Sequence, residues 1–205
     1  NKLIDARLRE ELKSGVQTIQ YQINTLMTTN GQSPFVTLFL NLDKDDEYLE
    51  ENAMIVEEIL RQRLEGIKNE KGVYVTPAFP KLIYVLDEHN CLKGGKYDYI
   101  TKLAVECSSK RLYPDYISAK QMRATYQGNV FSCMGCRSFL SPWKDENGNF
   151  KFEGRFNQGV VSINLPQIGI LANKDEDAFW KLFDERLELC FEALMVRHNA
   201  LKGIK

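Results

Sequence analysis

Apolar residues recur at helical and at strand-like spacings along the first half of the chain. Intervals of three and four predict a helix over residues 3–27, with its apolar positions at Leu8, Leu12, Val16, Ile19, Ile23 and Leu26. The run FVTLFLNL at 35–42 is nearly apolar on both faces, which indicates a strand buried in a mostly parallel sheet. A second run, FPKLIYVLD at 79–87, predicts another buried strand.

The pattern between and after these strands is helical. The acidic run DKDD at 43–46 supplies N-cap residues for a helix. The apolar residues expected on its inner face are Leu49, Ile55, Val56, Ile59, Leu60 and Leu64. Residues 66–72 form a polar exit and residues 90–98 a loop. Residues 99–110 then predict a short amphipathic helix with Cys107 on its apolar side.

The second half of the chain carries turn and strand signals. Pro114 excludes residues 111–119 from a central strand position, because proline cannot donate to the ladder. The Asn-Gly pair at 147–148 marks a tight turn between two extended arms within 144–154. Residues 158–166 read as a buried strand that ends at its proline.

A last helix is expected from the capping-box spacing of Asn173 and Glu176 to about Ala200, with Gly203 just past its end. Strands that alternate with helices along a chain are typical of α/β proteins. The sequence therefore predicts an α/β layer or barrel.

Composition narrows the class of protein. The 205 residues are 43% hydrophobic and 27% charged, as expected of one good-sized globular domain. A net charge of −1 argues against nucleic acid as a partner, and no apolar run approaches the roughly 20 residues that span a membrane. Five scattered cysteines without a secretion signal indicate a reduced, cytoplasmic protein. The chain opens inside an apparent helix without methionine, so we expect a segment of a longer protein.

The stretch FSCMGCRSFLSPW at 131–143 holds two of the cysteines, Cys133 and Cys136. One CxxC unit and two isolated histidines, His89 and His198, do not make the four-ligand set of a structural zinc site. The stretch has no helical period, which argues against a thioredoxin-like pair at a helix start and predicts a loop. Two interpretations stay open on these residues alone: an inert buried pair, or chemistry that needs a single thiol.

The neighbouring residues supply a resemblance. MGCRSFL at 134–140, followed by GRFNQGVVSINLP at 154–166, resembles the central region of the anaerobic, class III ribonucleoside-triphosphate reductases. NGQSPFVTLFLNL, FPKLIYVLDE and SKRLYPDY resemble further segments of the same family, so the resemblance spans nearly the whole chain.

The resemblance implies a fold and a set of site residues. The chain would be one central segment, 1–205, of a ten-stranded α/β barrel in which a finger loop carries the catalytic cysteine. Matched residue by residue, that cysteine is Cys136, and Asn157 would face the same substrate. Met134, Arg137 and Ser138 flank the cysteine and are candidate substrate-binding residues. Each of the three also has an alternative role that stays open. Met134 could fill a gap in the packing, Arg137 could pair with a barrel carboxylate, and Ser138 could cap a turn.

The resemblance also implies chemistry and partners. A glycyl radical outside this chain would oxidise the Cys136 thiol, and the resulting thiyl radical would take the 3′-hydrogen of a ribonucleoside triphosphate, with formate as reductant. The implied partners are a radical-SAM activating enzyme, ATP or dNTP effectors and a second copy of the full-length enzyme.

The sequence departs from the family in what it lacks. The N-terminal ATP cone, the C-terminal four-cysteine zinc site and the glycyl-radical glycine have no counterpart here, and Cys133 is an extra thiol without an assigned role. We expect the fragment alone to be inactive. The alternative function is a non-catalytic α/β nucleotide-binding or allosteric module in which Cys136 is structural.

Overall fold

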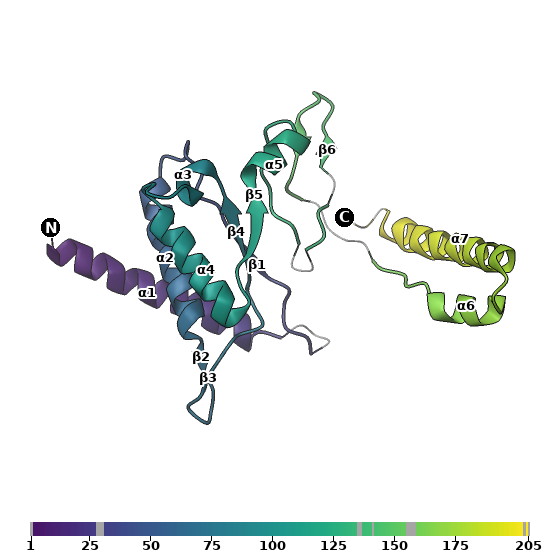
Figure 1. The fold of residues 1–205 in the computed structure, drawn as a ribbon, viewed down its shortest axis with the longest axis horizontal. Helices are drawn as coiled ribbons and strands as arrows, with labels where there is room; N and C mark the ends of the chain where they lie inside the picture. Colours follow the sequence, from purple (N-terminus) through teal and green to yellow (C-terminus); the bar gives the residue numbers. More distant parts are fainter. Residues whose placement is uncertain are drawn as a thin grey trace. The chain divides into compact units, whose positions relative to one another are not determined.

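The structure is a computed structural model of the chain, and it describes residues 2–27, 31–134, 137–140, 142–154, 159–202 and 204. The chain divides into two compact units, Asn1–Ser141 and Pro142–Lys205. The first unit is an α/β layer, and the second is a hairpin followed by two helices (Figure 1).

The first unit contains most of the helices and strands. In chain order they are α1 (Lys2–Thr25), β1 (Thr37–Leu40), α2 (Leu49–Glu65), β2 (Ile67–Lys68), β3 (Tyr74–Val75), β4 (Lys81–Leu86), α3 (Glu88–Cys91), α4 (Asp98–Arg111), β5 (Asp115–Ser118) and α5 (Ala119–Thr125).

A three-stranded parallel sheet lies at the centre of this unit, in the order β1-β4-β5. Thr37 of β1 pairs with Lys81 of β4, and Ile83 of β4 pairs with Asp115 of β5. The connections between these strands contain α2 and α4, as parallel pairing requires a long crossover. The predicted α/β class and the parallel sheet are confirmed. The ten-stranded barrel stays a prediction, because the chain supplies only these three parallel strands among the residues that are described.

The core forms where α1, α2 and α4 meet the sheet. α2 and α4 lie side by side in Figure 1, and their buried residues share one cluster with those of β1 and β4. The fully buried members of that cluster are Leu60, Leu82, Ile100 and Ala104, together with Tyr84. Ile83 and Val85, which alternate with Leu82 and Tyr84 along β4, are buried as well, so both faces of the central strand are covered, as the apolar run predicted.

Two details of α2 differ from the prediction. Ile55 is 40% exposed rather than on the inner face. The N-cap is Tyr48, not a residue of the acidic run. Asp46 accepts hydrogen bonds from the Tyr48 N–H at 2.9 Å and from the Asn52 side chain at 2.6 Å, so the acidic run forms the turn that precedes the helix.

Short elements account for the other differences in this unit. Residues 66–72, expected to be a plain exit, begin an antiparallel hairpin in which Ile67 pairs with Val75. The hairpin leaves α2 at Gly66, whose φ is +89° and whose α-carbon lies against the Val75 carbonyl oxygen, so that a Cβ there would be only 2.7 Å from this oxygen. At the end of β4, Asp87 and Asn90 form a capping box that starts the four-residue helix α3.

The second unit contains the strands β6 (Trp143–Lys144) and β7 (Phe150–Lys151) and the helices α6 (Leu165–Ala172) and α7 (Glu176–Leu201). β6 and β7 pair antiparallel around the predicted turn, where the Gly148 N–H donates to the Asp145 carbonyl at 2.9 Å. The hairpin prediction is confirmed.

The strand predicted at 158–166 is wrong. Residues 159–164 have no regular secondary structure, and α6 begins at Leu165. Asn164 caps this helix by accepting from the Gln167 N–H at 3.1 Å, and the proline at 166 lies in the first turn, where its missing N–H costs nothing.

The last helix is confirmed, with a different cap. Asp175, rather than Asn173, accepts from the Ala178 N–H at 3.0 Å at the start of α7. Asn173 instead ends α6 in the left-handed conformation, with φ +48°. α7 is 26 residues long, and none of its side chains is buried. Within the described residues, no helix has both the length and the apolar character needed to cross a membrane.

Candidate active-site loop

The cysteine-bearing stretch lies in a loop that follows α5. β5 ends at Ser118, whose side chain caps α5 by accepting from the Gln121 N–H. From Tyr126 onward, the described residues up to 140 form neither helix nor strand (Figure 1). The loop predicted over residues 131–140 is therefore confirmed for the part of it that the structure describes.

Aromatic rings hold the described part of this loop in place. Phe131 is only 5% exposed, and its ring lies 4.8 Å from the ring of Tyr126 and 6.1 Å from that of Phe139, both in edge-to-face geometry. Cys133 is buried, with 6% exposure. The loop therefore has an apolar anchor on both sides of the CxxC motif.

Backbone hydrogen bonds join the residues that flank the central Gly-Cys pair. The Met134 N–H donates to the Ser138 carbonyl at 2.9 Å, and the Arg137 N–H donates to the Met134 carbonyl at 2.8 Å. Arg137 has φ +67°, in the left-handed region. The pair itself, Gly135 and Cys136, lies outside the described residues. Asn157 does too, so an inward-pointing Cys136 and a cavity shared with Asn157 stay predictions.

The side chain of Arg137 binds the start of β5. Its Nε lies 2.7 Å and its Nη2 2.6 Å from the same carboxylate oxygen of Asp115. Nη2 is also 3.3 Å from the Tyr113 hydroxyl. This is the pairing with a carboxylate that the sequence left open as one of two interpretations of Arg137.

Tyr113 is surrounded by cations. Lys81 Nζ lies 4.8 Å from its ring centroid, the Arg137 guanidinium 5.6 Å and the Arg63 guanidinium 5.7 Å. Burial raises the pKa of Tyr113, but hydrogen bonds from Lys81 and Arg137, together with their positive charges, outweigh burial and lower the pKa below its ordinary value. The same contacts raise the pKa of Arg137, first through its hydrogen bond to Asp115. Arg137 is therefore a permanent cation held at the amino end of β5.

The two remaining flanking residues have simpler environments. Met134 is half-buried, and Ser138 is exposed and uses its carbonyl to close the loop. The substrate contacts predicted for both side chains stay predictions, because the described residues do not test them.

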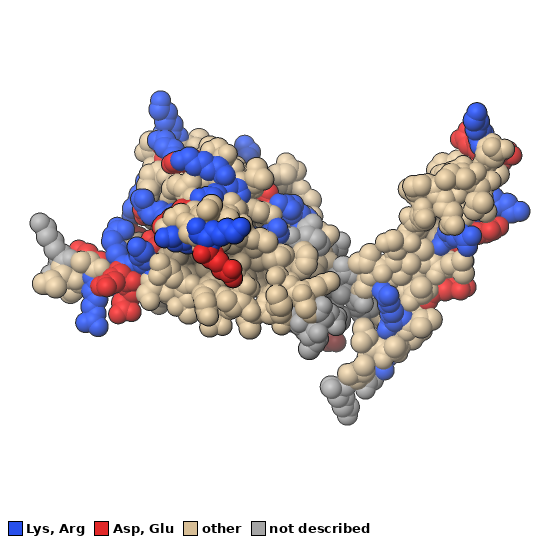
Figure 2. All heavy atoms as spheres, turned by 90° about the horizontal axis from the view of Figure 1, so that it is seen from below, with Lys and Arg blue, Asp and Glu red and all other residues tan. Residues whose placement is uncertain are grey.

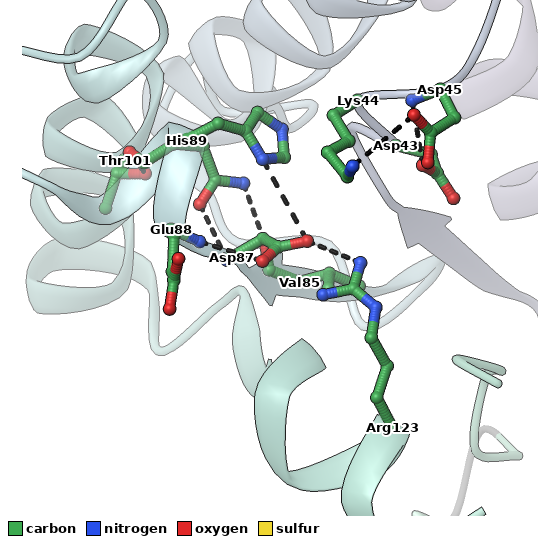
Figure 3. Close-up of polar contacts among 10 residues, drawn as sticks. Asp43, Lys44, Asp45, Val85, Asp87, Glu88, His89, Thr101 and Arg123 are labelled. Carbon is green, nitrogen blue, oxygen red and sulfur yellow. Dashed lines mark hydrogen bonds and ion pairs between the residues drawn. The ribbon is translucent and has the colours of Figure 1, made fainter. Parts of the chain in front are cut away.

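A second polar cluster lies at the opposite, carboxyl end of the sheet (Figure 3). Asp87 follows β4, and its Oδ2 lies 2.6 Å from Nη2 of Arg123 on α5 and 3.9 Å from Nδ1 of His89. Hydrogen bonding by Arg123 lowers the pKa of Asp87, and the Glu88 N–H and the charges of Arg123 and His89 act in the same direction. Asp87 is therefore an ionised anchor for α5, the helix that leads into the cysteine loop.

This cluster borders a cleft of about 400 Å³, whose lining residues are Lys44, Asp87, Glu88, His89, Lys120 and Arg123. Ligand crevices of parallel α/β sheets lie outside the carboxyl ends of their strands, so this is where such a crevice is expected. Sequence reasoning missed the cluster. The signal was present, because charged residues follow immediately after each of the two buried strands, at 43–46 and at 87–88.

Neither the surface charge nor the metal-ligating residue types point to a further site in the described part of the chain. Acidic and basic side chains are interspersed on the face of each unit seen in Figure 2, in keeping with the net charge of −1. In the described part of the chain, no three histidine, cysteine or acidic side chains gather in a way that could hold a metal ion.

Comparison with known proteins identifies the family. The family model described as anaerobic ribonucleoside-triphosphate reductase matches residues 3–205 of the chain. The chain belongs to this family. The motif-based resemblance is thereby confirmed, and the cysteine loop lies within the matched region.

Individual reductases of the family align over nearly the whole chain. The anaerobic ribonucleoside-triphosphate reductase of Escherichia coli strain K12 is 44% identical over 203 residues, which cover 98% of this chain and 27% of the relative. The enzyme with the same name from enterobacteria phage T4 is 43% identical over 206 residues, covering 98% of this chain and 33% of the relative. The chain thus spans about a quarter to a third of the length of these reductases.

Proposed function

We propose that this chain contributes the substrate-radical cysteine of an enzyme that reduces ribonucleoside triphosphates to deoxyribonucleoside triphosphates in the absence of oxygen. The observation that carries the proposal is the match of the cysteine loop and its surroundings to reductases over 98% of the chain. The anchored loop supports it, because hydrogen-atom transfer needs a sulfur held next to the ribose carbon.

The reaction divides into a few balanced steps. The chemistry that a glycyl radical supplies is removal of one hydrogen atom from the Cys136 thiol. The sulfur radical of Cys136 then takes the 3′-hydrogen of the ribose, and the 2′-hydroxyl leaves as water after protonation. Formate supplies a proton and two electrons and is released as carbon dioxide, so that a hydrogen replaces the lost hydroxyl on the 2′-carbon. The hydrogen on Cys136 returns to the 3′-carbon, and the sulfur radical so re-formed takes back a hydrogen atom from the glycine.

The other candidate residues bind and orient the substrate. The Asn157 amide can donate to and accept from ribose hydroxyls without adding charge. Met134 packs against the nucleotide and Ser138 lies on the substrate side of the loop, while the guanidinium of Arg137 is bound to Asp115 and acts by orienting the loop. Cys133 has no role in the chemistry.

The rest of the enzyme supplies what this segment lacks. We infer a ten-stranded α/β barrel completed by other parts of the polypeptide, a zinc-containing C-terminal region with the glycyl radical, and regulation by ATP and deoxynucleotides. The full-length enzyme would be a cytoplasmic homodimer that a radical-SAM enzyme activates, and its products would be used for DNA replication. This segment alone would be inactive because it has no means to oxidise Cys136.

A second function is a non-catalytic α/β nucleotide-binding or allosteric module. The cleft of about 400 Å³ at the carboxyl end of the sheet is the feature that favours it. In that case Cys136 would be a structural thiol.

The test is an anaerobic assay of the full-length protein after activation. Reduction of a ribonucleoside triphosphate, with one labelled carbon dioxide released from formate for each deoxynucleotide formed, is expected. Nucleotide binding without any reduction, in protein whose glycyl radical is visible by electron paramagnetic resonance, would favour the module. The 205-residue segment, assayed in parallel, should give no product.

A further inference from the structure

The strained backbone next to the candidate catalytic cysteine has an identifiable support. Arg137 has φ +67°, in the left-handed region, which is unfavourable for a residue with a Cβ. Such a conformation persists only where the surroundings hold it, and it is common at functional sites. Its neighbour in the sequence is Cys136.

The groups that hold Arg137 come from the start of β5. Two of its side-chain nitrogens contact one oxygen of Asp115, at 2.7 and 2.6 Å, and the Tyr113 hydroxyl lies 3.3 Å from Nη2. The ring of Tyr113 is itself contacted by the cations of Lys81, at 4.8 Å, and Arg63, at 5.7 Å. Lys81 is the first residue of β4, so the support extends to the central strand of the sheet.

The magnitude of the ion pair indicates its role. The Arg137 and Asp115 side chains are 50% and 31% exposed, and ion pairs in such positions contribute little to stability. The pair is therefore of little use as a stabiliser of the fold. The pair instead orients the Arg137 side chain, because two nitrogens on one oxygen define the direction of the guanidinium.

The ion pairs of Arg123 and Arg137 fix the two ends of the segment that leads from α5 into the cysteine loop. Arg123 of α5 is bound to Asp87 at the carboxyl end of β4, whereas Arg137 is bound to Asp115 at the amino end of β5. The described residues from Arg123 to Met134 therefore lead back from the carboxyl end of the sheet, and the ion pairs of Arg123 and Arg137 lie at opposite ends of it. Phe131, which lies between Arg123 and Arg137 in the sequence, is buried.

We propose that Asp115 and Tyr113 are positioning residues for the cysteine loop: they fix Arg137, the residue next to Cys136, and hydrogen-atom transfer at Cys136 depends on this support. This inference rests on the proposed function of Cys136. Neither Asp115 nor Tyr113 needs to touch substrate.

The experiment uses the full-length enzyme and the variant Asp115→Ala. The turnover number kcat should fall by about ten- to a hundredfold, because a misplacement of about 1 Å in a reacting group can cost on the order of a hundredfold. KM should stay within about twofold, because substrate binding is not the contact that is lost. The glycyl-radical signal and the thermal midpoint should match those of the unmodified enzyme. Asp115→Asn, which keeps one oxygen as acceptor, should be intermediate.

A second readout follows the loop itself. Alkylation by iodoacetamide, quantified for each cysteine by mass spectrometry, should change several-fold in rate at Cys136 in Asp115→Ala and stay constant at Cys91. The matched control is Glu106→Ala, which breaks the exposed ion pair of Glu106 with Lys110 on α4, at 2.7 Å, and should change neither kcat nor the alkylation rate.

The possible outcomes separate the inference about Asp115 from the proposed function of Cys136. Unchanged kcat and unchanged alkylation at Cys136 in Asp115→Ala would overturn the inference while leaving the proposed function in place. An active Cys136→Ser enzyme would overturn the proposed function itself. If Asp115→Ala does not fold, Tyr113→Phe removes only the hydroxyl oxygen and is assayed in the same two ways. A Tyr113→Phe enzyme identical to the unmodified one in both assays would then contradict the inference.

Discussion

Arg123 and Asp87 tie the helix before the cysteine loop to the central strand of the sheet. Their side chains meet at 2.6 Å although the residues lie 36 positions apart. The Asp87 side chain is only 10% exposed and the Arg123 side chain 35%, so much of this contact is shielded from solvent. Removing Arg123 would leave a nearly buried carboxylate without its main partner.

Arg123→Gln should therefore destabilise the protein by about 1–3 kcal/mol at pH 7. The pKa of Asp87 is lowered in the folded state, so its contribution is present above the unfolded pKa, about 3.9, and is lost as the pH falls through the lower folded value. The difference between variant and unmodified protein should be constant from pH 7 to about pH 5 and shrink below about pH 4.

The check is the unfolding midpoint of both proteins across this pH range. Arg7→Gln is the matched control, because it removes an arginine that pairs with Glu11 at 3.9 Å with both side chains exposed, and it should cost less than about 1 kcal/mol. A difference for Arg123→Gln that grows as the pH falls would contradict the account.

The core packing of α2 gives a second prediction. Leu60 is fully buried between α2, α4 and the sheet, and Leu60→Ala should cost about 2–5 kcal/mol through lost burial and the cavity left behind. Ile55, on the same helix and 40% exposed, should cost less than about 1.5 kcal/mol when changed to alanine. Equal losses of unfolding free energy in denaturant titrations would mean that the face of α2 has been assigned wrongly.

The reactivity of the cysteines gives a third prediction. Burial raises the pKa of the Cys107 thiol to about 11, so at pH 8 only about one thiol in a thousand is ionised. Cys91 is exposed. In the native protein at pH 8, iodoacetamide should label Cys91 while Cys107 stays unmodified. In denaturant it should label both cysteines. Rapid native labelling of Cys107, located by peptide mass spectrometry, would show that α4 is not packed as described.

The elements that the sequence predicted are those whose signal is local. The helical period of α1, α2 and α4 and the doubly apolar runs of β1 and β4 each lie within one segment, so no distant contact is needed to recognise them. The Asn-Gly turn between β6 and β7 is recognisable for the same reason.

The errors arose where a distant partner or a competing local signal decides. The run at 158–166 looks like a buried strand, but Asn164 offers a helix cap and the residues from 165 on continue as a helix. The β2-β3 hairpin depends on pairs such as Ile67 with Val75 and on Arg111, which donates to the carbonyls of Leu64 and Glu65. Arg111 lies more than 40 positions from both of these carbonyls, so a local sequence pattern cannot predict the contact.

The candidate site shows the same division. The motif around Cys136 could be recognised from the sequence, and a carboxylate partner for Arg137 was one of the interpretations. The identity of that partner, Asp115, could not be read, because it lies 22 positions upstream and is brought close only by the return of the loop along the sheet. The Asp87–Arg123 pair was missed for the same reason.

The most direct test of the central claim, that Cys136 is the thiol of a radical reductase, is anaerobic turnover by the full-length enzyme carrying Cys136→Ser, with Cys133→Ser as its matched control. Oxygen replaces sulfur at similar shape, so packing losses should be small, about 1 kcal/mol, while the stronger O–H bond prevents hydrogen transfer. The account predicts no reduction by Cys136→Ser and substantial reduction by Cys133→Ser, in proteins whose fold, nucleotide binding and glycyl-radical signal are retained. An active Cys136→Ser enzyme, or a folded, radical-bearing Cys133→Ser enzyme without activity, would contradict it.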